Sequence, residues 1–228
     1  MSRVLVAVAA LACATAAVVA GCGDDDDRDR TAGTTATTPA PPPAADEALW
    51  PAPGEAVADP RKTARAFAQE YIGVENPALS EFRETEPGVG EVEVHRRGED
   101  GRALDTVVSA IALRQVDGED WSVMSAHSAE VEVTAPDARA EIASPVRVDG
   151  RGRGFEGNVV LEVRDQYAPE PLAQKAVTAG SAGQLEPFTA RLAFDPGDAA
   201  VGAIVAKTGS GIAAADGFVA FVVRFAGD

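Results

Sequence analysis

Cysteine is almost absent from this sequence. The two that occur, Cys13 and Cys22, lie close to the N-terminus, so the rest of the chain holds neither a disulfide framework nor a cysteine-ligated metal site. Histidine also occurs only twice, and aromatic residues make up 5% of the chain. Because zinc sites need several thiolate or imidazole ligands, we expect no metal and no cofactor. The folded part must therefore be held together by packing.

Basic residues are few relative to acidic ones. The 228 residues include 20 lysines and arginines against 36 aspartates and glutamates, which gives a net charge of -16. Such a surface repels nucleic acids and anionic bilayers, so neither is expected to bind the folded part. The acidic excess is concentrated in the stretch from residue 23 to residue 136.

An apolar run follows Arg3 and extends from Val4 to Ala20. A membrane-spanning helix needs about 20 apolar residues and flanks that retain it, whereas this run is shorter and ends in small residues. Residues 1–21 are therefore interpreted as a secretory signal peptide, and a spanning helix is the alternative.

The end of this run resembles the lipobox of bacterial lipoproteins, in the residues Val19-Ala20-Gly21-Cys22. The resemblance implies cleavage between Gly21 and Cys22 and acylation of the Cys22 thiol. Several acyl chains such as palmitate on one residue anchor a protein almost permanently. We therefore expect a lipoprotein on the extracytoplasmic face of the cell membrane. A secreted protein with an incidental cysteine is the alternative.

Residues 22–58 carry no periodic apolar pattern. They contain the acidic run Asp24–Asp27, a threonine-rich stretch and the proline-rich segment Pro39–Pro43. This composition buries too little apolar surface to offset the entropy of ordering, so we predict a disordered tether. The aspartates are interpreted as a self-repelling spacer, with a calcium site as the alternative. Trp50 is expected to pack on the domain that follows.

Residues 59–136 are expected to form a small α+β domain. Asp59-Pro60 is typical of a helix start, an apolar stripe at spacings of three and four follows it, and Gly73 ends it. Alternation of apolar residues then predicts a curled antiparallel sheet of three strands, Glu91–Arg96, Thr106–Arg114 and Trp121–Val133. In the last strand Trp121, Val123 and His127 share one parity, which predicts that they face the core.

Residues 137–228 show no helical pattern and predict an all-β sandwich. Short strand-like runs bounded by glycine, proline, aspartate or serine occur at Glu141–Val148, Phe155–Val163, Leu172–Val177, Phe188–Phe194, Ala203–Thr208 and Phe218–Phe225. Several of them alternate apolar and polar residues, so each is expected to bury one face. The glycine-rich stretch Gly150–Gly154 lacks the order of a phosphate loop and is interpreted as an ordinary loop.

The sandwich resembles the immunoglobulin-like domain associated with bacterial spore-germination proteins. The elements that carry the resemblance are Ser144-Pro145-Val146, Phe155-Glu156-Gly157 and Pro187-Phe188, in that order. The resemblance implies a noncatalytic envelope module. The first domain resembles, more weakly, the nuclear-transport-factor-like and cystatin-like folds, in its helix and in Trp121-Ser122-Val123.

Few residues suit catalysis, and we do not expect an enzyme. The best catalytic arrangement would place His127 with Asp105 or Tyr71 in a pocket of the first domain. The expected function is a membrane-anchored lipoprotein with a noncatalytic binding or structural role in the cell envelope, toward a protein or glycan partner, with a role in sporulation or germination as one option. The alternatives are a small-ligand-binding protein or weak enzyme using residues 59–136, and a solute-capture subunit of a transporter.

Overall fold

A computed structural model describes residues 48–98, 100–116, 118–181, 183–209 and 215–227. It does not describe the side chains of Phe155, Ala215 and Asp216. The predicted signal peptide, Cys22 and most of the tether lie outside the described residues.

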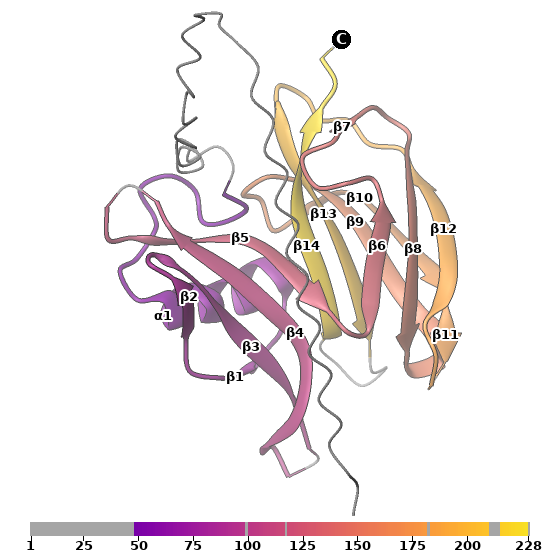
Figure 1. The fold of residues 1–228 in the computed structure, drawn as a ribbon. Helices are drawn as coiled ribbons and strands as arrows, with labels where there is room; N and C mark the ends of the chain where they lie inside the picture. The colour runs from indigo at the N-terminus through magenta and orange to yellow at the C-terminus, as the bar shows by residue number, and fades with distance from the viewer. Residues whose placement is uncertain (1–47, 99, 117, 182, 210–214, 228) are drawn as a thin grey trace, which may run out of the picture. The chain divides into compact units, whose positions relative to one another are not determined.

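A helical segment comes first and is followed by strands (Figure 1). The helical elements are α1 (Pro60–Ala66), η2 (Phe67–Ile72) and the short η3 (Phe155–Gly157). The strands of the first half are β1 (Ala78–Leu79), β2 (Arg83–Glu86), β3 (Val89–Arg97), β4 (Ala103–Gln115), β5 (Trp121–Ser128) and β6 (Val131–Ala135). Those of the second half are β7 (Glu141–Ile142), β8 (Val146–Gly154), β9 (Asn158–Asp165), β10 (Pro171–Thr178), β11 (Gly180–Ser181), β12 (Glu186–Leu192), β13 (Val201–Gly209) and β14 (Ala215–Phe225).

The helical segment begins and ends where the sequence predicts. The Asp59 carboxylate accepts hydrogen bonds from the backbone N–H groups of Arg61 and Lys62, both at 3.0 Å. These bonds satisfy donors that the first turn of any helix leaves free. At the other end Gly73 has φ of 91°, a left-handed conformation that favours glycine. The second half of the segment, η2, is a π-helix rather than an α-helix.

Two sheets organise the strands. The larger has the order β1-β3-β4-β5-β14-β13-β9-β10, with β2 paired to β3 and β7 paired to β14. The smaller has the order β11-β8-β12, with β6 paired to β8. An α+β region of one helical segment on an antiparallel sheet is thus followed by an immunoglobulin-like sandwich, and the predicted fold class is confirmed.

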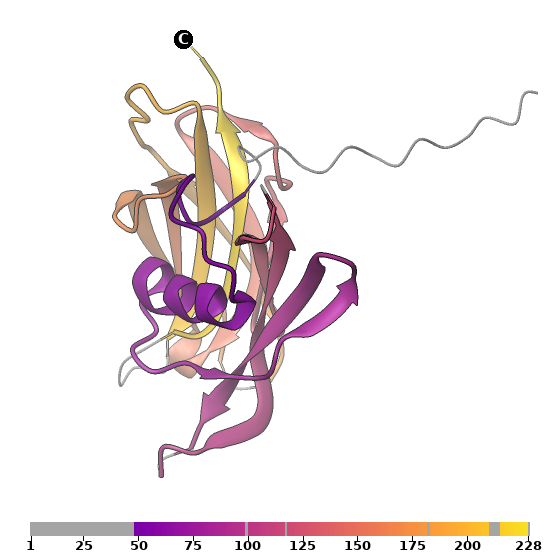
Figure 2. The same ribbon diagram turned by 90° about the vertical axis from the view of Figure 1, so that its left-hand side faces the viewer.

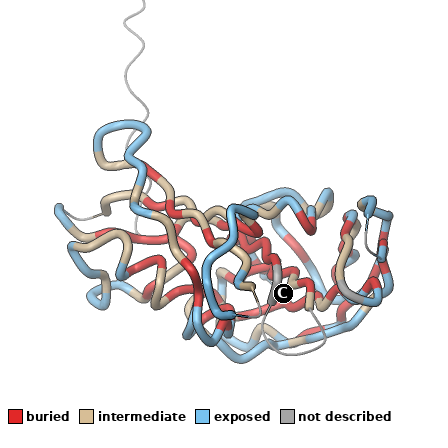
Figure 3. Tube along the Cα trace, turned by 90° about the horizontal axis from the view of Figure 1, so that it is seen from below, coloured by how far each residue is buried: buried red, intermediate tan, exposed pale blue. Residues whose placement is uncertain are grey.

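The α+β region and the sandwich share the larger sheet. Strands β5 and β14 are neighbours in it, through the pairs Ala126–Ala220 and Ser125–Phe221. Residues on one side of β14, such as Phe218, pack with Phe67 of the helical segment. Figure 2 shows this segment lying across the strands of the sheet. Residues on the other side of β14, such as Phe221, pack into the sandwich core. Strand β14 therefore contributes to both hydrophobic cores. Figure 3 shows buried stretches of the chain in the interior and exposed stretches at the periphery.

The chain already packs on the sheet at its first described residues. Leu49 is fully buried, and its N–H donates to the Val123 carbonyl at 2.7 Å. The Trp50 ring lies 6.2 Å from the Phe67 ring, measured between centroids, which confirms the expected packing of Trp50. Part of the predicted tether, from residue 48 to residue 58, is thus a strap across β5.

The predicted strand Trp121–Val133 is wrong in its second half, because β5 ends at Ser128 and β6 pairs with β8 in the other sheet. The expected inward position of His127 is also wrong. A register shift opposite Ala112 and Leu113 leaves one extra residue in β5 and reverses the alternation beyond it. Ala126 is fully buried as a result, and His127 is exposed.

The predicted strand Glu141–Val148 also divides, into β7 of the larger sheet and β8 of the smaller one. The glycine-rich stretch Gly150–Gly154 is not a loop, because it forms the end of β8. A Cβ atom at Gly150 would overlap the ring of Phe188 and the carbonyl oxygen of Glu132. Glycine is therefore required inside this strand by the close approach of an aromatic ring.

Candidate binding face

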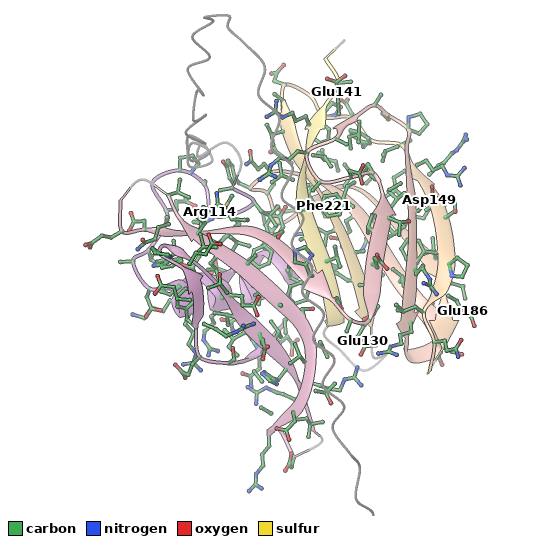
Figure 4. The ribbon with its side chains drawn as sticks, in the orientation of Figure 1. Arg114, Glu130, Glu141, Asp149, Glu186 and Phe221 are labelled. Atoms are coloured by element: carbon green, nitrogen blue, oxygen red, sulfur yellow. The ribbon has the colours of Figure 1, made fainter. Side chains whose placement is uncertain are left out.

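The outer face of the smaller sheet carries arginines, most of which are exposed in the described structure. Along β8, Val146 and Val148 are buried against the larger sheet, and the residues that alternate with them point outward. Asp149 lies on this outer side, near β12 (Figure 4). We define the arginine face as Arg147, Arg151 and Arg153 of β8 and Arg191 of β12, together with Asp149 and Thr189.

The register of β8 and β12 brings two of these arginines side by side. Arg147 is paired with Arg191, and Asp149 is paired with Thr189. Directly opposite residues of neighbouring strands have Cβ atoms about 4.5 to 5.5 Å apart. The two guanidinium groups therefore share one part of the surface, with a carboxylate and a hydroxyl beside them.

Asp149 is held by two donors on this face. The Nε atom of Arg147 donates to both of its carboxylate oxygens, at 3.0 and 2.8 Å, and the Thr189 hydroxyl donates at 2.6 Å. The hydrogen bond from Arg147, followed by that from Thr189, lowers the pKa of Asp149, so it is ionised at neutral pH. Its stabilising contribution is present above its unfolded pKa and is lost as the pH falls through the lowered pKa.

The other arginines differ in what holds them. Arg151 donates to the Leu185 carbonyl at 3.2 Å, and Arg153 donates to Glu130 at 2.7 Å. Arg191, in contrast, has no hydrogen bond or ion pair within the described part of the chain. An unpaired guanidinium thus stands next to Arg147 on an otherwise acidic protein.

A second polar cluster is buried beneath the helical segment. The Glu162 carboxylate accepts from Arg164 Nε at 2.8 Å and Lys207 Nζ at 2.6 Å, and Gln174 donates to it at 3.3 Å. The side chains of Glu162 and Arg164 are 2% and 3% exposed. We call Glu162, Arg164 and Lys207 the buried ion cluster.

The buried ion cluster attaches the helical segment to the sandwich. Arg164 of β9 donates to the main-chain carbonyl of Tyr71, and its guanidinium carbon lies 4.8 Å from the centroid of the Tyr71 ring. Burial raises the pKa of the Tyr71 hydroxyl far above its usual value. Because its members are covered and partnered, this cluster suits a structural role.

A third set of charges surrounds Glu130, at the connection between β5 and β6. The Glu130 carboxylate, between β5 and β6 (Figure 4), accepts from Arg153 at 2.7 Å and lies 3.5 Å from Arg96. These contacts join β3, the β5–β6 connection and β8. The α+β region and the sandwich are therefore linked by the ion pairs of Glu130 and by the contacts of Arg164 with Tyr71, as well as by the shared sheet.

The predicted catalytic arrangement is not assembled. His127 points away from the core that buries Tyr71, and its Nε2 atom lies 3.1 Å from the Ser125 hydroxyl. Asp105 is exposed on β4, five residues from the Ala110 that pairs with His127, or about 16 Å along the strand. His127 with Asp105 or Tyr71 is thus wrong as an acid–base pair.

Two hollows of the described surface are not lined by His127. One of about 160 Å³ lies between the strap at Pro51–Gly54 and the residues Asp120 and Ser122. An open groove of about 480 Å³ runs between the start of α1 and Phe82.

No cluster of three or more histidine, cysteine, aspartate or glutamate side chains suited to a metal occurs among the described residues. Cys22 and Gly21, the predicted lipidation and cleavage residues, lie outside them.

The sequence contained a signal for the arginine face that the loop interpretation missed. Arg147, Arg151 and Arg153 share one parity, and Val146, Val148 and the glycines share the other. Such alternation is the pattern of a strand with one buried face. The neighbouring position of Arg191, by contrast, depends on the pairing of β12 with β8, which the local sequence does not specify.

Comparison with protein families gives one match. Residues 130–211 match the model of a family described as the immunoglobulin-like domain of bacterial spore germination, which confirms the resemblance of the C-terminal domain. The matched range includes β6, which the sequence prediction assigned to the first domain. The chain was significantly similar to no curated protein and to no solved structure. Within the described ranges, no helix has the length and apolar character needed to cross a bilayer.

Proposed function

We propose that this protein is a lipid-anchored lipoprotein on the extracytoplasmic face of the cell membrane, where its arginine face binds an envelope partner without chemical conversion. The observation that carries this proposal is the arginine face itself, an exposed sheet surface on which Asp149 is held by two donors and the side chain of Arg191 has no partner among the described residues. It lies within the segment similar to an immunoglobulin-like family.

The filled interiors favour binding over catalysis. Phe67, Tyr71 and Phe218 are at most 1% exposed and occupy the space between the helical segment and the sheet. The sandwich core is likewise lined by valine, leucine and phenylalanine. A catalytic pocket needs convergent polar groups in a concave site, and the arginine face is instead an open strand surface.

The tether supplies the means of anchoring. Twenty-five residues lie between Cys22 and Ala48, so a lipid on Cys22 would be joined to the strap by this length of chain. The strap that begins at Ala48 would transmit this attachment to β5, because Leu49 and Trp50 both hydrogen-bond to Val123. Such an arrangement would attach the folded part to the membrane through its N-terminal side, whereas the arginine face lies on β8 and β12.

A role in germination is the finer part of this proposal. It rests on the description of the family that residues 130–211 match. The description concerns the family, and the argument for the arginine face does not depend on it.

Replacing Cys22 by serine is expected to move the protein from the membrane fraction to the soluble fraction. The serine hydroxyl cannot form the thioether through which the lipid is attached. Mass spectrometry of the N-terminal peptide of the wild-type protein should show the acyl chains on Cys22.

Cys13→Ser is the matched control, because Cys13 lies within the predicted signal peptide. This variant should remain in the membrane fraction. Membrane retention of Cys22→Ser, or an unmodified Cys22 in the wild-type protein, would contradict the lipid anchor.

A further inference from the structure

We infer that the Arg147–Arg191 pair of the arginine face binds the phosphate groups of a linear, phosphate-bearing envelope polymer. The inference rests on the proposed function and deepens it by naming the chemistry of the partner. It begins from the placement of two like charges directly opposite each other on neighbouring strands. Such pairs are destabilising in isolation, so an anion that lies between them would relieve their repulsion.

The hydrogen bonds on this face leave donors free for a ligand. Asp149 is bonded to the Nε atom of Arg147, so the two terminal nitrogens of Arg147 have no partner within the described residues. The guanidinium of Arg191 is unpaired in the same set of residues. The side chain of Arg147 is 59% exposed, so these nitrogens are accessible from solvent. Asp149 thus orients Arg147 without using its terminal donors.

Phosphate matches two neighbouring guanidinium groups better than carboxylate does. A carboxylate places both oxygens in one plane, which a single planar guanidinium fork already satisfies. A phosphate group is tetrahedral and accepts hydrogen bonds from forks in different planes. Because the Thr189 hydroxyl is already donated to Asp149, the pair of guanidinium groups supplies the recognition.

The shape of the surface favours an extended ligand. Arg147 and Arg151 point to the same side of β8 and are four residues apart, which is about 13 Å along a strand. The hollows described above are lined by residues of the strap, of α1 and of their neighbours, and not by the arginine face. Two cations at this spacing suit a chain that carries phosphate at intervals, although Asp149 lies between them on β8 and Glu132 of β6 is paired with Arg151.

The charge distribution restricts where such a polymer can approach. The net charge of -16 opposes any polyanion at long range, and the acidic excess is concentrated before residue 137. Binding at the arginine face must therefore be local and short-ranged. It should weaken as salt is raised above about 0.1 M, where the Debye length is about 10 Å.

The test measures binding of sodium polyphosphate to the full-length lipoprotein in detergent micelles by isothermal titration calorimetry at low salt. The double variant Arg147→Ala/Arg191→Ala is expected to bind at least tenfold more weakly than the wild type. Arg102→Ala is the control for the loss of a surface arginine, since it removes one positive charge from an exposed side chain in another part of the chain. It should change the affinity less than twofold.

Two further measurements test whether binding needs the forked donors of arginine and whether it prefers phosphate to carboxylate. Arg147→Lys/Arg191→Lys keeps the charge and removes the forked donors, and it is expected to lose most of the affinity. Poly-L-glutamate, a carboxylate polymer, is expected to bind at least tenfold more weakly than polyphosphate. Equal binding by the alanine double variant, equal loss in Arg102→Ala, full affinity in the lysine variant, or equal affinity for poly-L-glutamate would each overturn the inference. None of these results changes the Cys22 assay, so the two proposals fail separately.

Discussion

Replacing Glu162 by alanine is expected to lower the free energy of unfolding by about 3 to 5 kcal/mol. The change removes the acceptor for Arg164 and Lys207 and leaves a buried cation without its partner. The guanidinium of Arg164 is 3% exposed, so water cannot replace the lost carboxylate. Chemical denaturation in urea, followed by tryptophan fluorescence, would measure the difference.

Glu91→Ala is the matched control for this prediction. Glu91 also pairs with an arginine, Arg83, but the two side chains are 29% and 66% exposed. Exposed pairs contribute about 0 to 1 kcal/mol, so this variant should be close to the wild type. Equal stability of the Glu162 and Glu91 variants would show that the buried ion cluster does not hold the helical segment on the sheet.

Replacing Phe218 by alanine is expected to lower the free energy of unfolding by about 3 to 5 kcal/mol and to affect the α+β region and the sandwich together. Phe218 is fully buried and lies 6.3 Å from Phe67, measured between ring centroids. Its strand, β14, also supplies Phe221 to the sandwich core. Tryptophan fluorescence reports the α+β region, and far-ultraviolet circular dichroism reports mainly the strands.

The two signals should follow one transition in both the wild type and the variant, because the cores share β14. Leu172→Ala is the control, since Leu172 is 36% exposed and its loss should change stability by less than about 0.5 kcal/mol. Separate transitions in the wild type, or a loss confined to one signal, would contradict the coupling of the two regions.

Local signals in the sequence accounted for much of this fold. The cap at Asp59, the apolar spacing after it and Gly73 placed the helical segment, because each acts within a few residues. Alternation placed β3, β4 and β12 within a few residues of their observed bounds. These features depend on side-chain period and on turn residues, which a single sequence displays directly.

Features that depend on contacts between segments far apart in the sequence could not be predicted from local patterns. The extra residue in β5 turned His127 outward, and its cause is the pairing of β5 with β4. The local sequence predicts a loop at Gly150, because the Phe188 ring that requires glycine there lies on another strand. The sharing of one sheet by β5 and β14 likewise depends on contacts between remote segments.

The candidate site also combines a feature that the local sequence predicts with one that depends on strand pairing. Alternation along β8 specifies that Arg147 and Arg151 lie on one side, and it was present in the sequence. The place of Arg191 beside Arg147 follows from the β8–β12 register. Recognition of the face therefore required the pairing of strands as well as their composition.

Site-specific photocrosslinking on intact cells tests most directly whether this face binds an envelope partner. A photoreactive amino acid at Pro187, which is exposed on β12 and paired with Arg151, should capture an envelope component on irradiation. The same group at Leu104, exposed on β4 in the α+β region, should not capture it. Capture at Pro187 that is lost in the Arg147→Ala/Arg191→Ala background is the predicted result. Identical capture at both positions, or none at Pro187, would contradict the assignment of the arginine face as the binding surface.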